Sequence, residues 1–254
     1  MPDTEARILI NQEGTGIRED GLKYVINPYD EYAIEEGLKV REKVGGDSKV
    51  TVVTMGPEEA TELIRTALAM GADDAVHIVD PLLENAGPFT SAAVLAKVIE
   101  EEGFDIIFCG KQAIDDDMAQ VQTILAEMLD IPQVNVATEF ELSDDGKKAV
   151  LSRRIEGGDE KYETALPAII SCEKGLNEPR YASLPGIMKA KKKEIRKKTL
   201  ADLGFETKPQ GGRAEIVRWL PLPKSGECKI VEAEELQDAV KELVRLLREE
   251  SKVL

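Results

Sequence analysis

Three consecutive aspartates, Asp115, Asp116 and Asp117, stand in the stretch CGKQAIDDDMAQVQ, between an apolar run that ends at Phe108 and a segment with helical periodicity. Carboxylates repel one another and add nothing to a hydrophobic core, so they call for a role at the surface. A helix that starts near Met118 would present unpaired backbone N–H groups and the positive end of its dipole, which bind anions such as phosphate. We expect one aspartate to cap that helix and another to accept a hydrogen bond from a ribose hydroxyl. The alternative is three capping or solvated acids with no ligand.

Few other residues offer chemistry. The single histidine, His77, lies in the apolar run DAVHIV without a second histidine for metal binding, so we interpret it as a packed strand residue and expect no metal site. Cys109, Cys172 and Cys228 are widely spaced and odd in number, which predicts reduced, mostly buried thiols rather than a disulfide framework. The glycine-rich phosphate motifs G-x-G-x-x-G and G-x-x-x-x-G-K-[ST] are absent. We therefore expect no catalytic residues.

Strands and helices alternate from residue 49 to 136, which predicts a parallel sheet with crossover helices. The run FDIIFCG leads directly into the aspartate loop, at the carboxyl end of a strand, where open parallel sheets bind ligands. A helix is predicted over residues 28–44, with Asn27 as its cap and Gly45 after it, and Pro57 is expected to begin the next helix. The predicted fold class is therefore α/β, with a doubly wound, mostly parallel sheet.

The pattern changes after Asn135. Asp-Gly and Gly-Gly-Asp turns separate alternating segments, which predicts antiparallel hairpins. We assign residues 1–204 to a nucleotide-binding domain and residues 205–254 to a C-terminal arm with an amphipathic helix. One face of that helix carries Leu236, Val240, Leu243, Val244 and Leu247. Such a helix needs a surface to dock on, which another chain would provide.

Composition limits the function. The chain has 254 residues and a formal net charge of -16, which disfavours nucleic acid as a partner because phosphate binding depends on accumulated Lys and Arg. It has no apolar run of about 18 residues and no signal-peptide pattern at its N-terminus, so we expect no membrane insertion and a cytoplasmic location.

Four stretches, GKQAIDDDMAQ, NPYDEYAIEE, IRTALAMGAD and NEPRYASLPGIMKAKKK, closely resemble the β subunit of electron transfer flavoproteins, and the similarity covers residues 2–204. The resemblance implies that the α/β fold is of the adenine-nucleotide-hydrolase-like type. It also implies a heterodimer with an α subunit and one FAD at the interface. Such a carrier accepts electrons from acyl-CoA-type dehydrogenases, as in fatty acid β-oxidation, and passes them toward a quinone oxidoreductase. It also implies an AMP of structural role in the β subunit.

The resemblance carries over to individual positions. Those expected beside the nucleotide are Asn27, Pro28, Tyr29, Asp30, Met55, Gly110, Lys111, Gln112, Ala113, Ile114, Asp115, Asp116, Asp117, Met118, Ala119, Gln120 and Val121. Thr4 and Tyr29 match positions that lie toward the flavin. Those expected in partner recognition are Tyr181, Leu184, Pro185, Ile187, Met188 and Lys189.

Two features depart from the family pattern. Family members have a first strand ahead of the PDTEARI seen here, so we expect the native protein to be about ten residues longer, enough for one inner strand. Gln122 stands where the pattern has glycine, and its side chain is expected to narrow the space beside the phosphates.

Two alternative functions stay open. In the first, the protein would resemble family members that bind a second FAD in place of AMP and bifurcate electrons from NADH. Asp115–117 and the LPGIMKAKKK segment favour AMP, whereas residues 119–121 favour the second FAD. A stand-alone adenine-nucleotide enzyme, such as an ATP-cleaving ligase domain, would need a glycine- and serine-rich loop after its first strand, and none is present.

Residues 189–198 contain seven cations and one acid. They form either a solvated helix face or a charged rim that steers a partner. Beside them, Leu184 stands in an expected exposed turn, where the resemblance implies insertion into a hydrophobic pocket of the dehydrogenase. The alternative is that Leu184 packs on its own domain.

Overall fold

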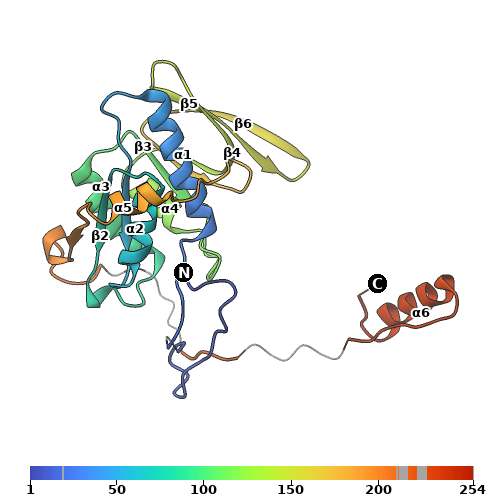
Figure 1. The fold of residues 1–254 in the computed structure, drawn as a ribbon. Coiled ribbons are helices and arrows are strands. Elements are labelled where there is room, and N and C mark those ends of the chain that lie inside the picture. Colours follow the sequence, from blue (N-terminus) through green and yellow to red (C-terminus); the bar gives the residue numbers. More distant parts are fainter. Residues whose placement is uncertain (19, 210, 212–216, 222–227, 254) are drawn as a thin grey trace. The chain divides into compact units, whose positions relative to one another are not determined.

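The computed structural model describes residues 1–18, 20–209, 211, 217–221 and 228–253 (Figure 1). The chain divides into two compact units. The first contains Met1–Ile8 and Arg18–Ile216, and the second contains Leu9–Ile17 and Val217–Leu254. The membership of Leu9–Ile17 in the second unit was not indicated by the sequence.

One parallel sheet consists of three strands in the order β1 (Thr51–Met55), β2 (Asp74–Ile78) and β8 (Arg196–Lys198). Helix α2 (Ala60–Met70) contacts β1 and β2, and α3 (Pro88–Glu102) contacts β1. The β-branched residues of β2 are fully buried, as expected for a strand that is covered on both faces. The Pro57 prediction is wrong, because two i to i+3 turns at residues 57–61 precede α2 and delay its start to Ala60.

A second, mixed sheet has the strand order β3 (Ile106–Gly110), β7 (Ala168–Cys172), β4 (Gln133–Leu142), β5 (Lys148–Ile155) and β6 (Gly158–Ala165). The first three strands are parallel, and β4, β5 and β6 are antiparallel, so the predicted hairpins are confirmed. Every residue of β7 is buried. The hairpin of β5 and β6 projects from the first unit, at the end opposite α2 and α3 (Figure 1).

The α/β class and the parallel strands are confirmed, and the described strands divide into two sheets because none of them hydrogen-bonds to both β1 and β3. The two sheets share helices. A Cβ at Gly37, on α1 (Pro28–Val44), would lie 3.6 Å from Val50 and 3.9 Å from Phe108. Leu95 of α3 packs against the core clusters of both sheets.

The remaining helices are α4 (Val121–Met128), α5 (Leu184–Ala190) and α6 (Leu236–Glu249), with short 3-10 turns η1 (Pro81–Leu83) and η2 (Ala201–Leu203). The predicted bounds of α1 are confirmed, with Gly45 after it at φ 67°. Helix α6 lies in the second unit, and none of its described residues is buried. None of the helices in the described ranges combines the length and the apolar character that crossing a bilayer requires.

Candidate functional site

The start of α1 and the loop after β3 meet through Asn27 and Asp30, although the bonded residues are 80 to 87 positions apart. The Asp30 carboxylate accepts hydrogen bonds from the Gly110 N–H at 2.7 Å and from Asn27 Nδ2 at 2.9 Å. Asn27 Nδ2 also donates to the Gln112 carbonyl at 2.9 Å, and Asn27 Oδ1 accepts from the Ile114 N–H at 3.3 Å. Two of the predicted nucleotide-binding stretches therefore form one hydrogen-bonded unit.

Glycine is required at position 110 by this close approach. A Cβ there would lie 2.8 Å from both Asp30 Oδ1 and Tyr29 Cβ, and 2.9 Å from the Asp30 nitrogen. Contacts this short do not occur between real side chains, so any other residue would separate α1 from β3.

A cation lies at the carboxyl end of β3. Lys111 Nζ is 4.6 Å from the centroid of the Tyr29 ring and forms an ion pair with Glu173, which follows β7. The ring face and the carboxylate both attract the ammonium group and restrict its position. The site therefore contains a positive charge beside the loop that carries the aspartates.

The aspartates lie on an exposed, irregular segment, residues 115–120. Asp116 Oδ1 accepts from the Met118 N–H at 3.0 Å, while Asp117 and Ala119 have left-handed backbones with φ 52° and 51°. For an alanine this conformation is strained, by about 1 kcal/mol or more. Strained backbone of this kind is concentrated at functional sites.

The capping prediction for Asp115, Asp116 and Asp117 is wrong. The two left-handed residues delay the helix, so α4 begins at Val121 and its N-cap is Gln120, which makes no side-chain capping bond. Asn27 does occupy the N-cap position of α1, but its side chain bridges to the loop instead of capping.

Gln122 connects the two ends of the loop between β3 and α4. Its buried side chain donates from Nε2 to the Lys111 carbonyl at 2.6 Å and to the Ala119 carbonyl at 3.1 Å. The sequence drew attention to Gln122 only as an unexpected bulky residue, and its role as a bridge across the loop was missed.

Three predicted residues lie apart from this hydrogen-bonded unit. Met55, at the end of β1, packs against the cluster around Val76 and Ile78, and Thr4 is exposed in a turn. His77 is fully buried, with Nε2 3.1 Å from the Gly56 carbonyl, which confirms a packed strand residue.

Burial controls the ionisation of the site. It raises the pKa of the Asp30 carboxyl, against the opposing effect of the hydrogen bonds from Asn27 and Gly110. Burial likewise raises the pKa of the Cys109 and Cys172 thiols, which keeps them protonated and unreactive. Cys228 is exposed, so the expectation of mostly buried thiols holds for two of the three.

A second group of predicted residues forms an exposed apolar strip, which we define as Tyr181, Leu184, Ile187 and Met188. Tyr181 is 96% exposed, Leu184 76% and Met188 56%, and Pro185 and Lys189 are also exposed. Leu184 begins α5 rather than lying in a turn. Its exposure contradicts the alternative that it packs on its own domain.

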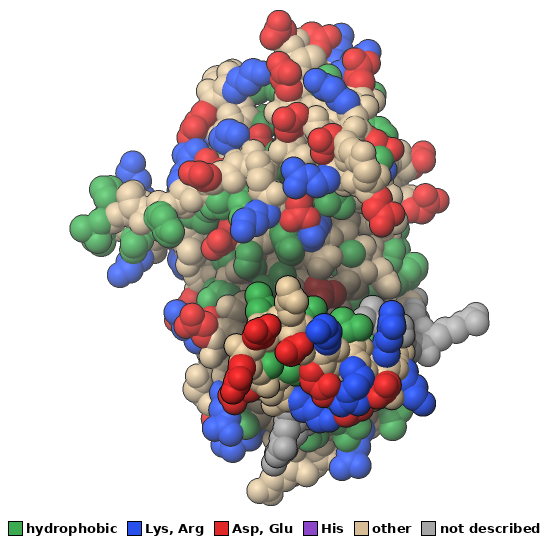
Figure 2. All heavy atoms as spheres, turned by 90° about the vertical axis from the view of Figure 1, so that its right-hand side faces the viewer, with side chains coloured by type: hydrophobic (Ala, Val, Ile, Leu, Met, Phe, Trp, Pro, Cys, Tyr) green, Lys and Arg blue, Asp and Glu red, His purple; other side chains and the backbone are tan. Residues whose placement is uncertain are grey.

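The basic run next to the strip is only partly neutralised. Its end forms β8, not a helix face, and there Arg196, Lys197 and Lys198 pair with Glu102, Glu58 and Glu101. No ion pair among the described residues involves Lys189, Lys191 or Lys192. Elsewhere, acidic and basic side chains are interspersed over the face shown in Figure 2.

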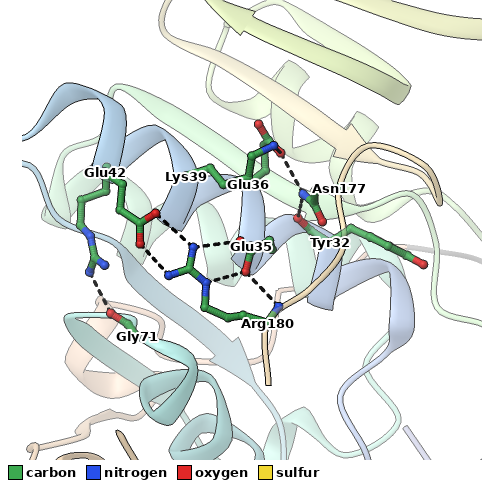
Figure 3. Close-up of polar contacts among 9 residues, drawn as sticks. Tyr32, Glu35, Glu36, Lys39, Glu42, Gly71, Asn177 and Arg180 are labelled. Atoms are coloured by element: carbon green, nitrogen blue, oxygen red, sulfur yellow. Dashed lines mark hydrogen bonds and ion pairs between the residues drawn. The ribbon is translucent and has the colours of Figure 1, made fainter. Parts of the chain in front are cut away.

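A polar cluster on α1 was not predicted from the sequence (Figure 3). In this cluster Arg180 donates hydrogen bonds to Glu35 and Glu42, and Asn177 donates one to Glu36. The only local signal is the spacing of Glu35 and Glu42, which places both on one face of a helix.

Known proteins of one family resemble this chain over most of its length. Residues 15–203 match the electron transfer flavoprotein domain. The chain is 44% identical to the electron transfer flavoprotein subunit beta of Bacillus subtilis (strain 168), over 99% of this chain and 96% of that protein. It is 40% identical to the subunit of the same name from Thermoanaerobacterium thermosaccharolyticum, over 97% and 94%, and 39% identical to that from Mus musculus, over 96% and 94%. The chain therefore belongs to the electron transfer flavoprotein family, as a β subunit.

Proposed function

We propose that this electron-carrier subunit pairs with an α subunit, shares one FAD with it, accepts electrons from acyl-CoA-type dehydrogenases and passes them toward a quinone oxidoreductase. The observation that carries the proposal is the joining of Asn27 and Asp30 to residues 110–114. These are the segments that the resemblance assigns to nucleotide binding. A cytoplasmic location stays a prediction from the sequence.

The loop after β3 has the donors and acceptors that an AMP needs. The N-terminus of α4 carries no side-chain cap, so its N–H groups suit a phosphate, and Lys111 adds a positive charge nearby. The exposed carboxylates of residues 115–117 suit ribose hydroxyls. Asn27 and Asp30 would shape the loop rather than contact the ligand, because both polar atoms of each side chain are already hydrogen-bonded within the protein. Gln122 would do the same through its Nε2, which bonds two carbonyl groups of the loop.

Gln122 supports AMP over a second FAD. Its buried side chain spans the loop between Lys111 and Ala119, and filled space beside the phosphates penalises a diphosphate more than a monophosphate. The alternative, an electron-bifurcating subunit with NADH as donor, would need that side chain to move.

FAD, when bound, supplies the redox chemistry, and the protein positions it. Thr4 and Tyr29 are the residues proposed to lie toward the flavin. Tyr29 is held against Lys111, which would restrict its ring. Most of the flavin site is expected on the α subunit.

The two other partner surfaces are the apolar strip and α6. An apolar anchor with a charged rim suits a transient complex, so we assign the strip, with Lys189, Lys191 and Lys192 beside it, to the dehydrogenase. Helix α6 exposes Leu236, Val240 and Leu243, and a permanent partner such as the α subunit would cover them.

The nucleotide content of the protein co-purified with its α subunit tests the proposal. After denaturation, the released nucleotides are identified by mass spectrometry and counted. One FAD and one AMP per heterodimer are expected. Two FAD would move the assignment to bifurcation, and release of FAD without any second nucleotide would contradict a nucleotide site at the loop after β3.

A further inference from the structure

Residues 177–183, between β7 and α5, form neither helix nor strand, yet side chains attach them to α1 (Figure 3). Asn177 Nδ2 donates to the Tyr32 carbonyl at 3.0 Å and to Glu36 Oε2 at 2.8 Å. Among the described residues, no backbone-to-backbone hydrogen bond outside helices and strands involves positions 177–182. The path of this segment therefore depends on its side-chain contacts.

Arg180 makes the largest set of these contacts. Its Nε and Nη2 donate to the two oxygens of Glu35 at 2.8 and 2.9 Å, and its Nη1 and Nη2 donate to the two oxygens of Glu42 at 2.6 and 3.2 Å. Its backbone N–H also donates to Glu35 Oε2, at 3.1 Å. We call Arg180, Glu35 and Glu42 the clamp; Figure 3 shows the guanidinium between the two carboxylates.

The clamp encloses a buried carboxylate. Glu35 is only 5% exposed, so its carboxylate depends on the guanidinium for compensation. The hydrogen bond from Arg180 lowers the pKa of Glu42, which is exposed at the outer side. A planar guanidinium satisfies both carboxylates at once, which a lysine cannot do.

The other end of the apolar strip is attached to α2. A Cβ at Gly186 would overlap the Ala69 carbonyl oxygen, so glycine allows α5 to approach α2 closely. Arg65 Nη1 donates to the Ala190 carbonyl at 2.6 Å. The strip thus lies between two attachments, the clamp on α1 and the contact of α5 with α2.

We propose that Arg180 is a positioning residue for partner recognition, because it holds the apolar strip in the arrangement that the dehydrogenase contacts. The inference rests on the proposed docking role of that strip. Tyr181, the residue next to Arg180, is almost fully exposed and has little else to order it. If the strip is already ordered in the free protein, binding does not cost the conformational entropy of ordering it, so the affinity for the partner is higher.

Two variants of the heterodimer test this role. Arg180→Lys keeps the positive charge beside Glu35 but loses the paired hydrogen bonds that the guanidinium makes to each of the two carboxylates. Glu42→Gln weakens the exposed contact with Arg180 without leaving a buried charge unpaired. Glu127→Gln is the matched control, since Glu127 is exposed on α4 and has no ion pair among the described residues. Leu184→Ala reports on docking itself.

We expect both clamp variants to speed amide hydrogen exchange in peptides covering residues 177–188 of the free heterodimer, by about threefold or more. With an acyl-CoA dehydrogenase as electron donor, the KM for the carrier should rise about three- to tenfold. The kcat and the FAD content should stay close to those of the wild type. Glu127→Gln should leave all of these unchanged.

Unchanged exchange, or faster exchange with an unchanged KM, would overturn the positioning role. If Leu184→Ala raises KM while Arg180→Lys and Glu42→Gln do not, only the role of the clamp fails. If Leu184→Ala also leaves KM unchanged, the docking function proposed for the strip fails, and the inference fails with it.

Discussion

The Gly110 N–H donates to the Asp30 carboxylate at 2.7 Å and thereby joins the end of β3 to the first turn of α1. The contact satisfies a backbone donor at the end of the strand. It also brings the Lys111 ammonium group over the Tyr29 ring, at the start of the loop proposed to bind AMP.

Gly110→Ala should destabilise the protein. The new methyl group would lie 2.8 Å from Asp30 Oδ1 and Tyr29 Cβ, and α1 would have to move away from β3. We expect the free energy of unfolding in urea to fall by about 1–3 kcal/mol. Gly158→Ala is the control, because a Cβ at Gly158 meets nothing within 4 Å and should change stability by less than about 0.5 kcal/mol. Equal effects at the two glycines would contradict the close-approach argument.

Gln122→Glu should loosen the loop and weaken AMP binding. The new side chain has the same shape but, when ionised, no donor for the Lys111 and Ala119 carbonyls. We expect a loss of about 1–3 kcal/mol in stability and a fall in AMP affinity by isothermal titration calorimetry. Gln120→Glu makes the same charge change at an exposed position two residues away. If it weakens AMP binding equally, charge and not the bridge is responsible.

Leu184→Ala should slow electron transfer from the dehydrogenase while leaving the FAD content unchanged. The leucine is exposed, so its removal costs the fold little and acts on the partner contact. Stopped-flow reduction of the carrier flavin by a reduced acyl-CoA dehydrogenase measures the rate, for which we expect about a tenfold loss at subsaturating carrier. Leu82→Ala, at another exposed leucine, should leave the rate unchanged. A wild-type rate for Leu184→Ala would refute the anchor role.

Acid should release the clamp. The hydrogen bond from Arg180, with smaller contributions from the charges of Arg180 and Arg41, lowers the pKa of Glu42 below its ordinary value. Because the folded-state pKa is the lower one, the stabilisation is complete above the unfolded pKa, about 4.3, and is lost as pH falls through the folded value. Glu35 accepts hydrogen bonds from the same guanidinium, on the buried side of the clamp (Figure 3).

Amide exchange, corrected for its intrinsic pH dependence, measures this release. Peptides covering residues 177–183 should lose protection as pH falls below about 4, with peptides from the fully buried β7 as the internal reference. Glu42→Gln should be less protected at neutral pH and respond less to acid. The same acid response in wild type and Glu42→Gln would show that another group controls the segment.

Local patterns determined the parts of this protein that depend on neighbouring residues. Asn27, Pro28 and Gly45 predicted the bounds of α1. The Asp-Gly and Gly-Gly-Asp turns predicted the hairpins of β4 to β6. The spacing of Leu236, Val240 and Leu243 predicted α6. Capping, turn and periodicity preferences act over a few residues, so a sequence displays them directly.

Only the tertiary structure decided the features that join distant residues. The left-handed residues Asp117 and Ala119 moved the start of α4 past the aspartates, and the Gln122 side chain closed the loop in front of it. Arg180 meets Glu35 across 145 positions of the chain. Such contacts form because packed helices and strands bring these side chains to one place, and no preference of the individual residues specifies their partner across that distance.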